Sequence, residues 1–141
     1  MAQTYASEVS GLGTIPSTNA NGAVQGGRIR RFRATITLAS QADGDTVVLA
    51  QVPAGYAFAY GVINASATLG GTATVAIGVS GTAGKYRTAA TFTAAAPTLF
   101  GNVGAVDDAP LTAAETVILT VGAAALPSSG TCTVDLYYSA P

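Results

Sequence analysis

The chain has 141 residues and a net charge of −1, only 9% of its residues are charged, and it contains no histidine. The near-zero net charge excludes a global basic field for nucleic acid, and the lack of histidine excludes an imidazole general base or zinc ligand. The length suits one domain, but alanine supplies 29 residues, and burying alanine stabilises a fold much less than burying Val, Leu, Ile or Phe. We therefore expect a modestly stabilised monomer whose weakly charged surface indicates a structural or assembly protein before an enzyme.

The first 27 residues form a polar segment without periodicity. Gly, Ser, Thr, Asn and Ala dominate it, and its apolar anchors are scattered at Tyr5, Val9, Leu12 and Ile15. Such a segment buries too little apolar surface to offset its own ordering entropy. We expect residues 1–27 to be an extended N-terminal arm whose anchors bind other chains. The alternative is a tail folded back on its own domain.

The first regular pattern is a two-residue alternation that starts at residue 28. Apolar residues occupy one face and polar residues the other, which is the period of a half-buried strand. The apolar face is Phe32, Ala34, Ile36 and Leu38, and the polar face is Arg31, Arg33, Thr35 and Thr37. We interpret this stretch as the place where the arm enters a β-domain of residues 28–141.

Four of the six Lys and Arg residues lie in this stretch, namely Arg28, Arg30, Arg31 and Arg33. Nucleic-acid binding is disfavoured, because there are few positive residues and no interleaved aromatic platform. A second interpretation is a solvated strand face, since surface ion pairs contribute little. The third is contact with acidic side chains of a partner, because a guanidinium binds a carboxylate through two parallel hydrogen bonds. The last two interpretations remain open.

Short strands separated by Gly, Pro and Asp turns follow as far as the C-terminus. The first of them, Thr46–Val52, is apolar on both faces, as expected for a central strand, and Pro53 ends it. The other expected strands are Ala57–Ala65, Thr72–Val79, Tyr86–Thr93, Thr116–Val121 and Thr131–Ser139, with a loop over Ser80–Gly84. Seven or eight strands of this kind predict an all-β fold, an antiparallel β-sandwich or jelly roll.

Two further patterns concern the C-terminal part of the chain. Thr112 and Glu115 match a capping box, which allows one helical turn at most, because the β-branched run that follows opposes a longer helix. In the last strand, alternation places Cys132, Val134, Leu136 and Tyr138 on the inner face. A mid-strand cysteine on that face is expected to be a small buried hydrophobe and not a nucleophile.

The remaining chemistry rests on carboxylates. Asp43 with Asp45, and Asp107 with Asp108, have the oxygen ligands that Ca²⁺ prefers, but neither pair has the spacing of a calcium loop. Turn chemistry explains both pairs equally, since Asp is common in turns. The Gly-rich pieces lack the Lys-Ser/Thr ending of a phosphate loop. We therefore expect no catalytic residues, no cofactor and no enzyme activity, and the question of a metal at either pair stays open.

The sequence also bears on cellular location. No basic region leads into an apolar run at the N-terminus, so a cleaved signal peptide is not expected. No stretch approaches the roughly 18 consecutive apolar residues of a membrane span. We expect synthesis in a cytoplasm and no membrane partner.

The layout resembles the small β-sandwich decoration, or cement, proteins of tailed-bacteriophage capsids. The polar arm ending at Gly26-Gly27, the core opening Asp45–Gly55 and the closing strand Gly130–Ser139 carry this likeness. The resemblance implies a jelly-roll-like domain, a homotrimer seated on the outer surface of an icosahedral head, and arms laid over the major capsid protein. It also implies a virion location after synthesis in the host cytoplasm, and a stabilising role without catalysis.

A carbohydrate-binding or adhesin-like module, such as a head fibre or tail component, is the alternative. Modules of that class use exposed aromatic platforms, for which Tyr56, Tyr60, Tyr86 and Tyr137 are candidates. The absence of tryptophan counts against this alternative.

Overall fold

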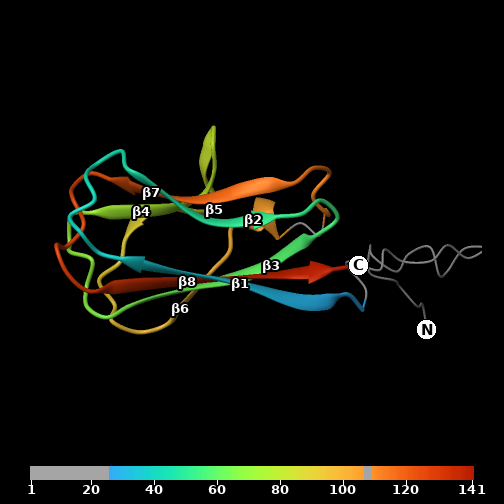
Figure 1. Ribbon diagram of the computed structural model, residues 1–141, viewed down its shortest axis with the longest axis horizontal. Helices are drawn as coiled ribbons and strands as arrows, with labels where there is room; N and C mark the ends of the chain where they lie inside the picture. The colour runs from blue at the N-terminus through green and yellow to red at the C-terminus, as the bar shows by residue number, and fades with distance from the viewer. Residues whose placement is uncertain (1–25, 107–108) are drawn as a thin grey trace, which may run out of the picture.

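The computed structural model describes residues 26–106 and 109–141, which form two β-sheets packed face to face (Figure 1). The predicted anchors of the arm, Tyr5, Val9, Leu12 and Ile15, lie outside the described residues, as do Asp107 and Asp108. None of the described residues forms a helix long and apolar enough to cross a membrane.

Eight strands and one short 3-10 helix make up the described fold. The strands are β1 (Arg28–Thr37), β2 (Thr46–Val52), β3 (Ala57–Ala65), β4 (Thr74–Val79), β5 (Thr82–Thr91), β6 (Thr98–Phe100), β7 (Glu115–Gly122) and β8 (Thr131–Ala140), and the 3-10 helix is η2 (Val103–Ala105). The first sheet has the order β1-β8-β3-β6 and the second the order β2-β7-β4-β5. Every pairing is antiparallel.

The connections define the topology. The chain alternates between the two sheets along β1, β2, β3 and β4, stays in the second sheet for β5, and then alternates again through β6, β7 and β8. Two four-stranded antiparallel sheets joined in this way are the arrangement of a jelly roll. The predicted all-β sandwich or jelly roll is confirmed.

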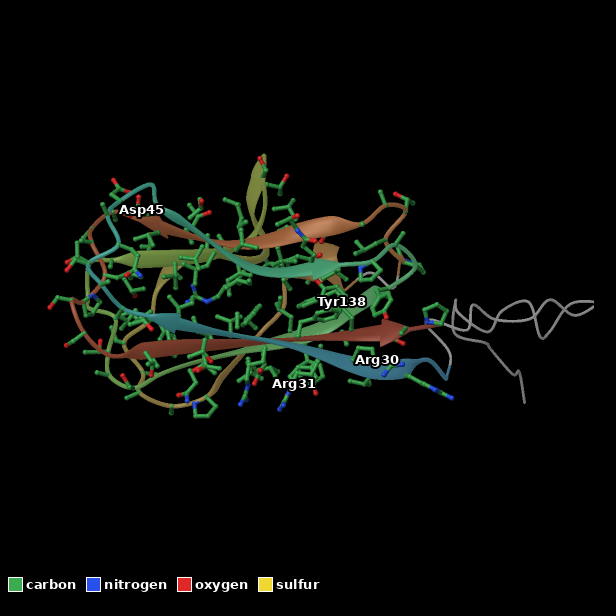
Figure 2. The ribbon with its side chains drawn as sticks, viewed as in Figure 1. Arg30, Arg31, Asp45 and Tyr138 are labelled. Carbon is green, nitrogen blue, oxygen red and sulfur yellow. The ribbon has the colours of Figure 1, made fainter. Side chains whose placement is uncertain are left out.

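The core lies between the sheets, and Figure 2 shows the side chains that fill it. Side chains with less than 2% exposure come from both sheets and, for Leu69, from the β3–β4 connection: Tyr86, Tyr138, Ile63, Leu69, Ile77, Leu119, Leu136, Val52, Val75, Val117, Val121 and Val134. Four rings pack together at one end, where Tyr138 contacts Phe32 at 5.7 Å, Phe58 at 5.3 Å and Tyr86 at 6.1 Å between ring centroids. The predicted inner face of β8 is confirmed, because Cys132, Val134, Leu136 and Tyr138 are all buried.

The prediction that Thr46–Val52 is a central strand is wrong. Among the described strands β2 pairs with β7 alone, so it is an edge strand of its sheet, and Val48 on its outer face is 61% exposed. A β-bulge between Val48 and Ala50 resets the alternation, so Val47, Leu49 and Ala50 all pack on the core side. The bulge thus places the consecutive Leu49 and Ala50 on the core side, while the apolar Val48 is exposed and not buried on a second face.

The single helical turn that the Thr112–Glu115 pattern allows does not form. The chain bends there, and β7 begins at Glu115. The Glu115 carboxylate accepts hydrogen bonds from the Tyr86 hydroxyl and the Lys85 ammonium, so its bonds run to distant residues. A capping box needs that side chain to return to the local backbone.

The boundaries of β5 differ from the predicted strand Tyr86–Thr93. Strand β5 begins at Thr82, because Ser80 and Gly81 alone make the turn from β4, with Gly81 at φ +84°. The predicted loop is therefore mostly strand. The three-residue strand β6 was not predicted, since a segment this short has no readable period.

Replacing Gly78 with alanine tests the close approach of β4 and β5. A Cβ at residue 78 would meet the carbonyl oxygens of Thr82 and Ala83 at 2.2 and 2.5 Å, so backbone has to move. We expect Gly78→Ala to lower the free energy of unfolding by roughly 1–3 kcal/mol, the usual cost of overpacking. Urea denaturation measures the free energy of unfolding. Gly71→Ala is the matched control, because nothing lies within 4 Å of a Cβ at residue 71. Equal stability of the two variants would contradict this close approach.

Candidate interaction surface

The outer face of the first sheet brings together residues from four strands. Antiparallel register aligns them in three rows across the sheet, because residues opposite each other on paired strands point to the same side. The rows are Arg31–Tyr137–Tyr60, Arg33–Asp135–Val62–Leu99 and Thr35–Thr133–Asn64. We call this surface the outer face. No sequence motif predicts the outer face, because each row joins residues that are tens of positions apart.

An ion pair joins β1 and β8 in the middle row. Arg33 donates two hydrogen bonds to Asp135, from Nε to Oδ1 at 2.7 Å and from Nη2 to Oδ2 at 2.6 Å. This is the bidentate geometry that makes Arg–carboxylate pairs strong. Asp135 is buried, and the Arg33 hydrogen bonds hold the pKa of its carboxyl below the usual range. Arg33 thus already has an acidic partner within its own domain.

The other three arginines of β1 form no ion pair within residues 26–106 and 109–141. Figure 2 shows Arg31 pointing away from the second sheet, whereas Arg30 lies toward the end of β1 that adjoins the N-terminal segment. Arg28 and Arg30 share the parity of Phe32 and yet are exposed. The structure therefore does not bring the four predicted arginines together as one group.

The remaining two basic residues of the chain are tied into the fold. Arg87 donates to the carbonyl oxygens of Val75, Ala90 and Thr91. Lys85 forms an ion pair with Glu115 at 2.6 Å, and the hydroxyl of the buried Tyr86 donates to the other oxygen of the same carboxylate. Sequence reasoning missed this network, because about 30 residues separate Glu115 from its partners.

The candidate tyrosines fall into two groups. Tyr60 and Tyr137 are neighbours on the outer face, with ring centroids 4.6 Å apart and ring planes inclined by 20°, and Tyr60 is 38% exposed. Tyr86 is fully buried, and the half-buried Tyr56 packs against Phe32. Among the four candidate tyrosines, Tyr60 and Tyr137 therefore offer a stacked pair of rings on the outer face.

Of the groups considered for metal binding and nucleophilic chemistry, the described ones, Asp43, Asp45 and Cys132, have structural roles. The Asp45 carboxylate accepts the Ala42 N–H, as turn chemistry predicts, whereas the Asp43 carboxylate accepts the N–H of the distant Ala123. Within the described residues no group of three or more His, Cys, Asp or Glu side chains is placed to hold a metal. Burial raises the pKa of the Cys132 thiol to about 11, so the reactive thiolate is disfavoured at neutral pH.

Comparison with known proteins shows a similarity of fold and nothing further. No family model and no curated protein matches the chain. Among solved structures, a chain from the capsid of Ralstonia phage GP4 aligns with TM-score 0.67 and 21% identity, covering 82% of this chain and 86% of that one.

Two further structures show the same likeness. A chain of the cyanophage Pam1 capsid asymmetric unit aligns with TM-score 0.63 and 17% identity over 82% of this chain and 86% of that one. A chain from the acidic stable capsid of Helicobacter pylori bacteriophage KHP30 aligns with TM-score 0.58 and 14% identity, covering 80% of this chain and 88% of that one. The jelly roll seen here is thus a fold present in chains of three phage capsid structures.

Replacing Asp135 with asparagine tests the ion pair. Because the folded pKa of Asp135 lies below its unfolded value, the pair stabilises the fold fully above the ordinary carboxyl pKa near 3.8, and this contribution is lost as pH falls through the lowered pKa. We expect Asp135→Asn to lower the melting temperature at pH 7, and its difference from wild type to shrink in acid. Thermal denaturation from pH 7 to 2 measures this, with Arg30→Gln as control. A difference that stays constant with pH would contradict the pairing.

Proposed function

We propose that this protein is a virion structural protein that decorates the outside of an icosahedral phage head and bridges subunits of the major capsid protein. The likeness of about four-fifths of the chain to chains of three phage capsid structures carries the proposal. The scarcity of charged residues supports it, because a surface with few charges is suited to being covered by other chains. The role requires no catalytic group and no cofactor.

The mechanism is mass action. A ligand that binds only the assembled shell stabilises that shell by its binding free energy. We assign attachment to the end of the domain where β1 begins, because two candidate contacts meet there. Arg28 and Arg30 lie at that end, and the N-terminal segment with the anchors Tyr5, Val9, Leu12 and Ile15 joins the domain beside them.

The partner chemistry follows from the arginines. Arg28, Arg30 and Arg31 are exposed guanidiniums without an acidic partner in the described part of the chain, so carboxylates on the shell are the complementary groups. Figure 1 shows the C-terminus and the start of β1 at the same end of the sandwich, as the pairing of Arg28 with Ala140 requires. The opposite end, near Asp45, would point away from the shell (Figure 2).

Co-sedimentation tests the proposed function directly. The heads would be produced from the genome that encodes this chain after deletion of the reading frame for the chain. They would then be mixed with the purified protein and pelleted. We expect saturable binding to intact heads and a higher temperature of head disruption when the protein is bound. A protein that stays in the supernatant at micromolar concentration would overturn the proposal.

Self-association is a second part of the proposal. The described domain leaves Val48, Leu99 and Val103 exposed at 61%, 68% and 90%, and a closed trimer is the state that the resemblance to decoration proteins implies. We expect analytical ultracentrifugation at micromolar concentration to give the mass of three chains. A mass of one chain would exclude self-association before attachment.

Neutralising the unpaired arginines tests the attachment surface. We expect Arg30→Gln/Arg31→Gln to reduce occupancy on heads at 0.1 M salt, and raising salt to 1 M to weaken wild-type attachment, because the screening length falls from about 10 Å to about 3 Å. Ser80→Glu/Thr82→Glu changes the net charge by the same amount at the exposed β4–β5 turn and serves as the matched control. Equal occupancy of both variants and wild type would assign attachment to other contacts.

Arg33 is left unchanged in this experiment for a structural reason. A negative side chain there would face the buried Asp135 carboxylate, so Arg33→Glu tests folding and not attachment.

A further inference from the structure

A pocket of about 210 Å³ lies on the outer face, next to the row that contains Arg31. Its lining comes from three strands, β1, β3 and β8, and the loop before β6: Arg33, Val62, Asn64, Pro97, Thr133 and Asp135. Register explains the position, because Thr133 pairs with Asn64, and Asp135 pairs with both Arg33 and Val62. Pro97, which directly precedes β6, closes one side.

The polar groups of this pocket are incompletely used by the protein. Arg33 engages Asp135 through Nε and Nη2, which leaves the two N–H groups of Nη1 without a hydrogen bond to any described residue. Within the same described ranges, the Asn64 amide and the Thr133 hydroxyl have no side-chain hydrogen-bond partner. Each Asp135 oxygen accepts one bond from Arg33 and retains a lone pair. The pocket therefore contains both hydrogen-bond donors and hydrogen-bond acceptors that the protein itself leaves unused.

The charges of the pocket select the class of ligand. Arg33 and Asp135 neutralise each other, so the residues that line the pocket carry no excess of either sign to attract a phosphate or a cation. Arg31 lies in the neighbouring row and does not line the pocket. A neutral ligand that both donates and accepts, through adjacent hydroxyl groups, matches this set. One hydroxyl can accept from Arg33 Nη1 while it donates to Asp135, and another can exchange bonds with Asn64 and Thr133.

The apolar part of the pocket favours a ring over an open polyol. Val62 and Pro97 present carbon atoms beside the polar groups, and the exposed Leu99 continues this strip because it pairs with Val62. In the neighbouring row, Tyr60 and Tyr137 offer aromatic surface two residues along β3 and β8. A pyranose combines polar edges with apolar C–H faces. The volume is below the roughly 300–1,000 Å³ of sites for drug-sized ligands, so one ring is the expected occupant.

We infer that this pocket, built by Arg33, Asn64, Thr133 and Asp135, binds a neutral saccharide, with one ring in the pocket and the next residue of a chain against Tyr60. This activity is additional to attachment to a head. Arg33 lies farther along β1 than Arg28 and Arg30, so a domain seated by the end where β1 begins leaves the pocket facing solvent. Arg31, in the row of Tyr60 and Tyr137, lies between the two surfaces.

Titration of the ¹⁵N-labelled full-length chain, followed by NMR, tests the inference on the free protein. The probes are the methyl glycosides of glucose, galactose and mannose, N-acetylglucosamine, and galacturonate as an acidic counterpart. We expect saturable shifts around Asn64 and Thr133 with at least one neutral probe. The dissociation constant should be on the order of millimolar, since a ligand of about a dozen heavy atoms gains little from an open pocket.

Two variants and a matched control make the result specific. Asn64→Ala and Thr133→Val each remove one polar group and should weaken binding by about two- to tenfold, the equivalent of one net hydrogen bond. Thr35→Val is the control, because Thr35 pairs with Thr133 in the same row but does not line the pocket. Far-UV circular dichroism confirms that each variant is folded.

The outcomes separate this inference from the proposed function. Absence of saturable shifts with every neutral probe overturns the pocket, as does binding of galacturonate alone or equal affinity of Asn64→Ala, Thr133→Val and wild type. None of these results bears on co-sedimentation with heads, which uses no sugar. Failure to sediment would in turn leave the titration unaffected.

Discussion

The pairing of β8 on both of its edges is the interaction on which the rest of the structure depends. Strand β8 pairs with β1 from Arg28 to Thr37 on one side and with β3 on the other, so it fixes three of the four strands of the first sheet. Its inner residues, Cys132, Val134, Leu136 and Tyr138, are buried in the core, while Asp135 and Tyr137 belong to the outer face. A slip of one residue would place the Asp135 carboxylate among apolar side chains, so the register is strongly specified.

Scarcity of charge gives each basic residue a definite place. Three of the six, Arg33, Lys85 and Arg87, are bound by carboxylates or carbonyl oxygens of their own domain. The other three, Arg28, Arg30 and Arg31, lie near the start of β1, where the N-terminal segment joins. The charges available to an acidic partner are therefore concentrated at one part of the molecule. This concentration, together with the jelly roll, is the physical basis for assigning attachment to that end.

The outer face combines two kinds of surface that one strand alone cannot supply. Its rows alternate in chemistry, with stacked tyrosines in one row, an ion pair beside apolar side chains in the next, and uncharged polar groups in the third. Because each row takes its members from different strands, a ligand crossing the face meets aromatic, charged and polar groups within a few residues of each strand. A surface with all three kinds of group suits recognition of a ligand that has both polar edges and apolar faces.

The sequence by itself determined the β class, most strand positions and the inner face of β8, because two-residue alternation depends only on which side chains meet the core. It also indicated a turn role for Asp45, since the hydrogen bond from the Ala42 N–H to its carboxylate is local, whereas the bond of Asp43 runs to Ala123, 80 residues away. Only the tertiary structure decided that β2 is an edge strand with a bulge, that Glu115 binds Tyr86 and Lys85, and that Arg33 is paired with Asp135 while Arg30 and Arg31 are not. These features join residues 29 to 102 positions apart or depend on strand order, and no local pattern encodes which distant strands become neighbours.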